Sequence, residues 1–544
     1  MERMREADPA QFWREFHEGQ DYKGSIRLYD RVKQNNLMFV GRQWEGVHAP
    51  DMVKPVFNIM KRVVNFEISS IVSDSVGVEL SAFGGGKDAL MEAAQEQVEK
   101  VFEYCKFGRI SREVLRNAAV DADGALHIYF EPGDGEDITQ GTPGRIRAEV
   151  VNNTEVFFGN PQRHDPQEQP YILIESHRDV RDVKEEMKRN GRPETDILAL
   201  APDGETEDKF AANYSGISDS KVTVLTRYWR EGGTIHYAKT TQTAVVKGAT
   251  DSGMKRYPIA WMSWDRNKYS YHGVSVIDGL IPNQILINKL AAMAARFLQN
   301  QAFPRVFYNK TVLPYWEAGV RPIGVQGNPN DVVYRDNHAT DMSSQVSEYI
   351  DKFISITKDL MGATDAALGN VNPDNTSAII AVQQASSVPL ELVKQEYYQF
   401  VEDVVRIVID QIATYYGVRA AEDGAWLDYS QLQPEAMNIN VDVGASAYWS
   451  EITSVQTLTN LYNTPVNEGS LIDPVTFLES MPGRYIPNKS RIVEELREKR
   501  QAQSMQAEEA FLLAGQAAAD AMPQESALLD EGQAMAQESG EEWE

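Results

Sequence analysis

The sequence predicts an α+β protein that is predominantly helical and divided into several domains. Apolar residues recur at helical spacing towards both ends of the chain, and short β-rich segments separated by turn residues occupy its second quarter. After residue 274 the chain shows a helix, a small β segment, a second helix, a loop and a very long helix. With 544 residues, 42% of them hydrophobic, it can bury more than one core.

The first 120 residues are expected to be mainly helical. Residues 9–34 form a first amphipathic stretch, and residues 55–74 carry a second one with a continuous apolar face. Three consecutive glycines at 84–86 predict a flexible break. Helices are then expected over 88–105 and onward to about residue 122.

From residue 125 the spacing of apolar residues becomes that of strands. Seven short segments rich in β-branched and aromatic residues are predicted as strands. They cover residues 125–131, 145–151, 156–159, 171–175, 221–230, 234–239 and 243–246. The polar stretch near 192–220 is expected to be a mobile insertion.

A helical pattern returns at residue 274 and carries the first candidate functional residues. Pro282, Lys289 and Arg296 are spaced seven apart, which places them on a common helical face. Asn300 follows Arg296 by about one turn. This face is therefore polar and charged on a helix that is otherwise mostly apolar.

A compact β-type interruption over 303–336 separates this helix from an amphipathic helix over 344–361. The loop 362–376, GATDAALGNVNPDNT, follows directly. Its glycines Gly362 and Gly369 are candidate hinges. A short loop between two long helices is expected to be a positioned element rather than a linker.

The helix after this loop is expected to span residues 377–416. Forty helical residues would extend roughly 60 Å, and Pro389 should kink the helix because it removes one backbone hydrogen bond. Beyond it the sequence predicts a strand over 437–443 and helices near 450–462, 473–480 and 490–506. The Ala/Gln/Glu-rich end, 507–544, is expected to be disordered.

The chain is acidic, with a formal net charge of −27 at pH 7. Ten acidic residues and no Lys or Arg follow Arg500, so the part up to that residue keeps a net charge of −17. This argues against a tight, sequence-independent nucleic-acid binder, which needs clustered Lys and Arg. It allows a surface past which DNA slides, and the alternative is that the acidity serves only solubility.

The remaining composition points to a reducing compartment and no membrane. The single cysteine, Cys105, cannot form an internal disulfide and is expected to be a small buried hydrophobe. The charged N-terminal residues lack the apolar stretch of a signal peptide. No run approaches the roughly 18 apolar residues of a membrane span.

No catalytic residue, cofactor or metal site is predicted. Residues 121–124, DADG, resemble the middle of an EF-hand loop, but Ala119 and Phe130 stand where the first and last ligands belong. Residues 84–87, GGGK, are followed by Asp and not by the Ser or Thr of a P-loop. HExxH, GxSxG and CxxC motifs are absent, and the eight histidines show no ligand spacing.

Local motifs resemble those of tailed-bacteriophage portal proteins, the head-to-tail connector rings. Residues 36–44, NLMFVGRQW, are similar to the Y-x-G-x-QW region of portals, and residues 58–64, NIMKRVV, to the N-x-I-x-K-x-V helix that follows. Residues 272–275, HGVS, and 280–289, LIPNQILINK, resemble the "G-x-S … Q-x-x-x-N" entry into the channel helix. The resemblance rests on their order and spacing and covers roughly residues 20–500.

The resemblance implies a portal-like multi-domain subunit with a wing that has a small β-rich region, a stem, a clip and a crown. The wing would take residues 1–270 and the rest of the wing, with the long kinked helix, 377–449. The other parts would be a stem helix at 271–301, the clip at 302–342, a second stem helix at 343–361, the tunnel loop at 362–376, the crown at 450–506 and an acidic tail at 507–544.

The implied function is a homo-oligomeric ring, usually a homododecamer, at one capsid vertex, without enzymatic activity. It would form the channel for DNA packaging and ejection, in the virion, after synthesis in the bacterial cytoplasm. The implied partners are other copies of the chain, double-stranded DNA without sequence preference, the terminase large subunit, head–tail adaptor or tail proteins, and the major capsid and scaffolding proteins. Another connector or minor capsid protein is an alternative, as is a DNA-packaging nuclease, for which the sequence offers neither clustered carboxylates nor a Walker motif.

In such a ring Lys289, Arg296 and Asn300 are candidate DNA-channel residues. Repeated by symmetry, the two cations would make weak, regularly spaced phosphate contacts. The alternative for them is salt bridging between subunits, with neighbours such as Asp278 or Glu348.

The loop 362–376 would bring neutral or repelling groups to DNA. These groups are Asn370, Asn372, Asp374 and Asn375. The alternative is that the loop only connects two helices.

Overall fold

The computed structural model divides the chain into two compact units, Met1–Ala445 and Ser446–Glu544. In the first unit it describes residues 7–443 apart from 51, 73–75, 83–88, 133–143, 204–219, 303–305, 316–321, 329, 331–332, 336–341, 361–389 and 421–425. In the second it describes 458–463, 465–466, 469–470, 474–480 and a few single positions up to 499.

The first unit begins with helices, as the sequence predicts, but with different boundaries. The stretch predicted as one helix over 9–34 is two helices, because Arg27 adopts a left-handed backbone conformation with φ of 55°. Residues 55–58 are not helical, since the side chain of Asn58 caps the next helix by accepting a hydrogen bond from the Lys61 N–H. The five helices are α1 (Pro9–Ser25), α2 (Leu28–Val40), α3 (Ile59–Ile71), α4 (Ala89–Cys105) and α5 (Phe107–Asp121).

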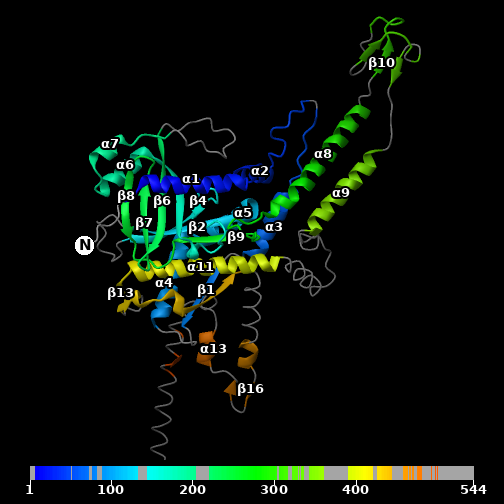
Figure 1. The fold of residues 1–544 in the computed structure, drawn as a ribbon. Helices are drawn as coiled ribbons and strands as arrows, with labels where there is room; N and C mark the ends of the chain where they lie inside the picture. Colours follow the sequence, from blue (N-terminus) through cyan, green and yellow to red (C-terminus); the bar gives the residue numbers. More distant parts are fainter. Residues whose placement is uncertain are drawn as a thin grey trace, which may run out of the picture. The chain divides into compact units, whose positions relative to one another are not determined.

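Two antiparallel sheets follow (Figure 1). A three-stranded sheet in the order β3-β2-β9 consists of β2 (Asp123–Pro132), β3 (Gly144–Val151) and β9 (Ile259–Ser263). A five-stranded sheet runs in sequence order through β4 (Val156–Phe158), β5 (Tyr171–Asp179), β6 (Lys221–Glu231), β7 (Thr234–Thr240) and β8 (Val245–Asp251). All seven predicted strands are present, and β9 is an additional one.

The polar stretch predicted as an insertion near 192–220 contains secondary structure in its first part. Helix α6 (Val180–Arg189) precedes it, and a short helix α7 (Glu194–Ala199) lies inside it. Ile197 and Leu200 are buried against Val183 and Met187 of α6 and against strand residues of the five-stranded sheet. Two apolar side chains therefore fasten the first part of a segment whose polar composition predicted mobility.

The main core gathers segments from the whole first unit around α11 (Glu391–Tyr415). Strand β1 (Val76–Ala82) pairs antiparallel with β15 (Met437–Val443), from Val76 opposite Val443 to Ala82 opposite Met437. β15 has the predicted bounds, whereas β1 was not expected. Of the predicted helix 377–416, the structure describes only the part from residue 390, and α11 begins at Glu391, so the kink at Pro389 lies outside the described residues.

The region after residue 274 has the predicted order of helix, strands and helix. It contains α8 (Val276–Ala302), β10 (Val306–Asn309), β11 (Pro322–Val325), β12 (Val333–Arg335) and α9 (Met342–Leu360). The strand order is β11-β10-β12, with β10 parallel to β11 and antiparallel to β12. We call this region the arm.

Smaller elements complete the description. A hairpin of β13 (Val418–Ala420) and β14 (Trp426–Asp428) follows α11 in the first unit. In the second unit, β16 (Pro465–Val466) pairs with β17 (Gly469–Ser470), and α13 (Pro474–Ser480) follows. No described helix is long and apolar enough to span a bilayer.

Candidate functional site: the arm and its anchor

The two helices of the arm pack along each other (Figure 1). The amide of Asn283 on α8 donates to the hydroxyl of Thr357 on α9 at 3.4 Å, and Thr357 is buried. Val346, Ile350 and Phe353 share the side of α9 that carries Thr357. The three strands β10–β12 lie between the helices in the chain, so the arm is a helical hairpin closed by a small sheet.

The first half of α8 is attached to the rest of the unit by buried amides. Gln284 accepts a hydrogen bond from the Ile59 N–H at 3.1 Å and donates to the Phe57 carbonyl. Asn288, one turn later, accepts from the Phe57 N–H at 3.2 Å and donates to the side chain of Gln43. Gln284 also donates to Asn288 at 3.1 Å. We call Gln43, Gln284 and Asn288 the amide clamp.

The clamp unites three motifs that are far apart in the sequence. Gln43 comes from the segment 36–44, and the clamped backbone immediately precedes α3. Two further bonds fix this meeting point: Trp44 donates to the Pro55 carbonyl and Asn58 donates to the Phe39 carbonyl, both at 2.8 Å. From the sequence alone, these residues were only marks of a family resemblance. Their function is to fasten α8 to α2 and α3.

The loop before α8 is also held by close contacts, like the first half of the helix itself. The hydroxyl of Ser275 lies 2.8 Å from the carbonyls of Ala119 and Val120, and it accepts the Ile277 N–H at 3.0 Å, which caps α8. A Cβ on Gly273 would lie 2.6 Å from the Asp265 carbonyl oxygen, so only glycine fits there. The G-x-S motif is thus a close-packed turn that sets where α8 starts.

The carboxylate of Asp123 fixes this turn by accepting hydrogen bonds in a buried network. Its carboxylate accepts the Ser263 hydroxyl at 2.7 Å and the Gly273 N–H at 2.9 Å, and lies 2.7 Å from Nδ1 of His272. Asp123 and His272 are almost completely buried. Burial lowers the pKa of His272, while the carboxylate of Asp123 opposes that effect. This pair has no spacing signal in the sequence, because 149 residues separate its members.

This network does not have the geometry of a nucleophilic site. The Ser263 hydroxyl is bonded to the carboxylate and not to the imidazole, and Nε2 of His272 is buried without a hydrogen-bond partner. A Ser–His–Asp site instead needs the imidazole between hydroxyl and carboxylate. The arrangement is therefore structural.

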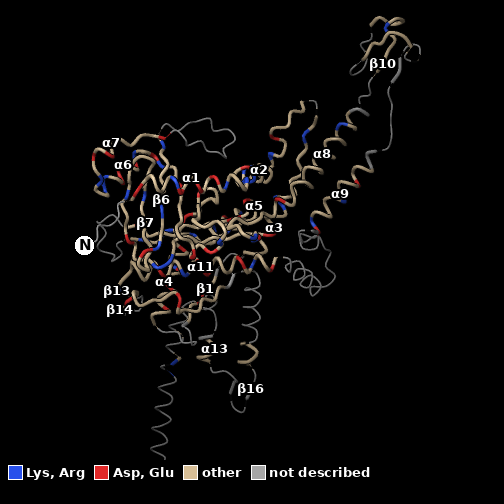
Figure 2. Tube along the Cα trace, viewed as in Figure 1, with Lys and Arg blue, Asp and Glu red and all other residues tan. Residues whose placement is uncertain are grey.

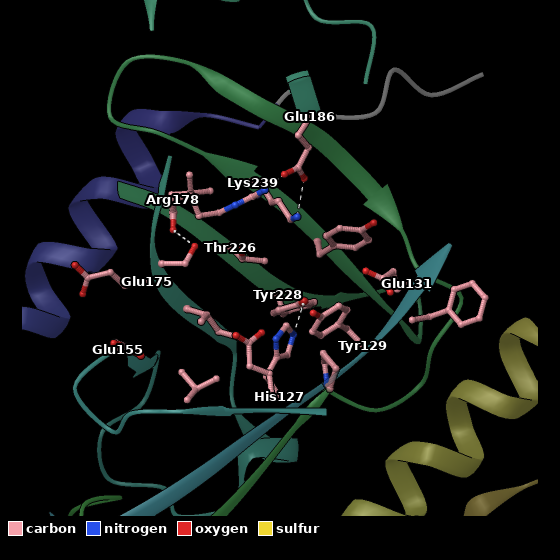
Figure 3. A pocket seen from close by; sticks show the side chains of 18 of the residues that line it. His127, Tyr129, Glu131, Glu155, Glu175, Arg178, Glu186, Thr226, Tyr228 and Lys239 are labelled. Atoms are coloured by element: carbon pink, nitrogen blue, oxygen red, sulfur yellow. Dashed lines mark hydrogen bonds and ion pairs between the residues drawn. The ribbon is translucent and has the colours of Figure 1, made fainter. Parts of the chain in front are cut away.

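A cavity of about 710 Å³ lies between β2–β3 and the face formed by β5, β6 and β7 (Figure 3). At one end, Glu186 accepts hydrogen bonds from Lys239, at 2.7 Å, and from Arg178. In the interior, Nε2 of His127 lies 2.9 Å from the Tyr228 hydroxyl. Burial, followed by the charge of Lys239, lowers the pKa of His127 to about 3, so its imidazole is neutral at pH 7.

The cavity lining also lacks a catalytic arrangement. Ser176, the serine among its lining residues, donates to the Val224 carbonyl and does not contact a base. Glu155 accepts from the backbone and side chain of Asn152. Among the residues that the structure describes, no group of three or more His, Cys, Asp or Glu side chains could bind a metal ion.

The structure describes only some of the predicted site residues. Lys289 and Arg296 are exposed on the second half of α8 and have no hydrogen bond or ion pair within the described part of the chain. Asn300 lies near the end of α8, and its side chain is not described. The other predicted site residues lie outside the described residues: Gly362, Gly369, Asn370, Asn372, Asp374, Asn375 and Pro389.

The comparison with known protein families identifies the chain. The sequence profile of the family described as "Phage P22-like portal protein" matches residues 14–542. No curated protein sequence matches the chain significantly. Proteins of this family are structural, non-catalytic components of the phage capsid, in agreement with the absence of a catalytic motif from the sequence. The motifs anchoring α8 and the match over nearly the whole length lead to one conclusion: the chain belongs to the phage P22-like portal protein family.

Proposed function

We propose that copies of this chain form a closed ring, a homododecamer, whose channel carries double-stranded DNA during packaging and ejection. The supporting observation is the construction of the arm. Its base is fixed by the amide clamp and by Ser275, whereas its outer part keeps exposed side chains on both helices. A rigidly aimed hairpin of this kind can be repeated around an axis to form a wall.

The proposed domains follow the elements. Helices α8 and α9 form most of the stem, proposed over 271–301 and 343–361. Strands β10–β12 belong to the clip, proposed over 302–342, which also takes the last residue of α8 and the first of α9. The wing comprises 1–270 and the region 377–449 with α11, and the crown is 450–506. The clip is the proposed docking site for the terminase large subunit and later for head–tail adaptor or tail proteins. Major capsid and scaffolding proteins would contact the outside of the ring.

The proposed DNA-facing groups are mostly neutral. They are Asn300 at the end of α8 and the tunnel loop 362–376, in which Asn370, Asn372, Asp374 and Asn375 follow the second of the two hinges, Gly362 and Gly369. Weak contacts suit a channel, because tight phosphate binding would slow translocation. Two partners remain open for Lys289 and Arg296, namely DNA phosphates and the carboxylates of an adjoining copy.

The ring is tested by negative-stain microscopy and native mass measurement of the purified full-length chain. We expect closed rings with a central hole. A stable monomer at high protein concentration would contradict the proposal.

The loop is tested by deleting residues 369–372. Because these residues are proposed to meet DNA and not other subunits, rings should still form, while DNA packaging or retention should fall. A deletion mutant that packages and retains DNA normally would show that the loop is only a connector.

A further inference from the structure

From Leu286 outward, α8 carries an exposed stripe of alternating apolar and basic residues. Leu286 is 37% and Met293 60% exposed, which is high for large apolar side chains. Lys289 lies between them and Arg296 follows, and the spacing of three, four and three residues places all four on one side of the helix. We call these four residues the basic stripe.

Helix α9 has a corresponding exposed stripe with acidic residues. Tyr349 is 59% and Ile356 42% exposed, again seven residues apart. Glu348 and Asp359 lie beside them on the side turned away from Thr357, and Lys352 lies between the two carboxylates. We call Glu348, Tyr349, Ile356 and Asp359 the acidic stripe.

The two stripes are complementary in charge. The basic stripe has two cations and no carboxylate, because the one acidic residue of α8, Asp278, lies at the base, where it accepts from Asn35 at 2.9 Å. The outward side of α9 has Glu348 and Asp359 with Lys352 between them, and Asp351 and the half-buried Lys358 lie seven residues apart at its margin. Figure 2 shows the positions of these charges along the two helices.

The charged members of the two stripes do not face each other within one chain. The contact between α8 and α9 uses Asn283 and Thr357, and Lys289, Arg296, Glu348 and Asp359 lie on other sides of their helices. Two different, complementary faces on one subunit describe a heterologous contact, which closes into a ring under rotational symmetry. A second copy of this chain is therefore the occupant that fits both stripes.

The apolar members distinguish this occupant from DNA. A phosphate backbone offers partners for Lys289 and Arg296, but none for Leu286 and Met293. A neighbouring helix that presents Tyr349 and Ile356 beside carboxylates accommodates both kinds of side chain.

Building on the proposed ring, we infer that the basic stripe of one copy packs against the acidic stripe of the next. Lys289 and Arg296 then bind carboxylates of the adjoining α9 and do not bind DNA. Leu286 and Met293 cover Tyr349 and Ile356 of that copy.

Charge reversal and its compensation test this inference. We would compare the wild type with K289E/R296E, with E348K/D359K and with the protein that carries all four changes, by native mass measurement at equal subunit concentration. Each double reversal should reduce the ring fraction at least tenfold, and the combined variant should recover most of it. R14E/K33E, which changes two exposed cations on α1 and α2, is the matched control and should form rings normally.

The outcomes separate the inference from the proposed function. If K289E/R296E forms normal rings but retains less DNA, the two cations face DNA and the inference is wrong, although the ring stands. If both reversals lose the ring and the combined variant does not recover it, the pairing is wrong. If the wild type itself remains monomeric, the ring proposal fails, and the inference with it. Circular dichroism and thermal unfolding of each variant show whether the subunit itself is folded.

Discussion

The two halves of α8 differ in their contacts with the rest of the same chain. In the first half, Gln284 and Asn288 are buried and satisfy backbone groups of the same chain. In the second half, Met293 is 60% exposed and Arg296 has no partner within the described residues. One helix thus serves subunit folding with its first turns and, in our proposal, subunit assembly with its last. Substitutions at its base should lower subunit stability, whereas substitutions on its outer side should alter assembly alone.

Of the substitutions at the base of α8, Asp123→Ala is expected to lower the free energy of unfolding most. The change leaves the Ser263 hydroxyl, the Gly273 N–H and the His272 ring without their acceptor in a buried site. Removing one member of a buried charged network costs about 3–5 kcal/mol. Denaturant unfolding should therefore show a large loss of stability. Asp30→Ala, whose side chain is 80% exposed, is the control and should change stability by about 0.5 kcal/mol or less. Equal losses for both variants would show that the base of α8 is not specially anchored.

Glu67→Gln should act in the opposite direction and depend on pH. Glu67 lies on α3, which packs against α8, and burial raises the pKa of its carboxyl from 4.5 to about 8. Below pH 4.5 it is protonated in the folded and unfolded states alike. Between pH 4.5 and 8 only the unfolded state releases the proton, so the wild type loses stability as the pH rises.

The neutral amide removes this loss. The stability advantage of Glu67→Gln should be near zero at pH 4.5 and reach a few kcal/mol at pH 8, on the order set by the shift in pKa. Denaturant unfolding at several pH values measures it. An advantage that does not change with pH would show that Glu67 is ionised in the folded protein.

Asn288→Ala should produce a smaller effect. It removes an acceptor for the Phe57 N–H and a donor for Gln43, at a cost of about 1–3 kcal/mol for buried groups left unpaired. Met293→Gln on the outer half is the matched comparison, and should change subunit stability by about 0.5 kcal/mol or less while it weakens assembly. Thermal unfolding and native mass measurement report the two quantities separately. If Met293→Gln destabilises the isolated subunit as much as Asn288→Ala, the division of α8 into two halves is wrong.

Residue composition and turn signals predicted most of the strands. The seven strands expected over 125–246 are present, and the strand over 437–443 has the predicted ends, whereas β1 was missed although its buried Val78 and Leu80 alternate with the exposed Glu79. β9 was missed because all five of its residues are buried, so it shows no alternation. The break between α1 and α2 was missed because Arg27 adopts a left-handed backbone conformation, and arginine is not a residue type that predicts one.

The contacts that anchor the base of the arm could not be predicted from local sequence patterns. Its motifs were recognised by resemblance, but their contacts join residues more than 200 positions apart, which local patterns do not encode. One signal was available: Gln284 and Asn288 lie one turn apart on an otherwise apolar helical segment, where buried amides need partners. The pair of Asp123 and His272 offered no comparable signal.

The pairing of β1 with β15 has a consequence for the order of events during synthesis. About 360 residues separate the two strands, so at ~5–20 residues per second β1 waits roughly 20–70 s for its partner to be translated. The sequence of the arm lies between them and is translated before the pair can form. The edge of β1 therefore stays unpaired until translation has passed residue 443, and we expect a subunit to join a ring only after that point.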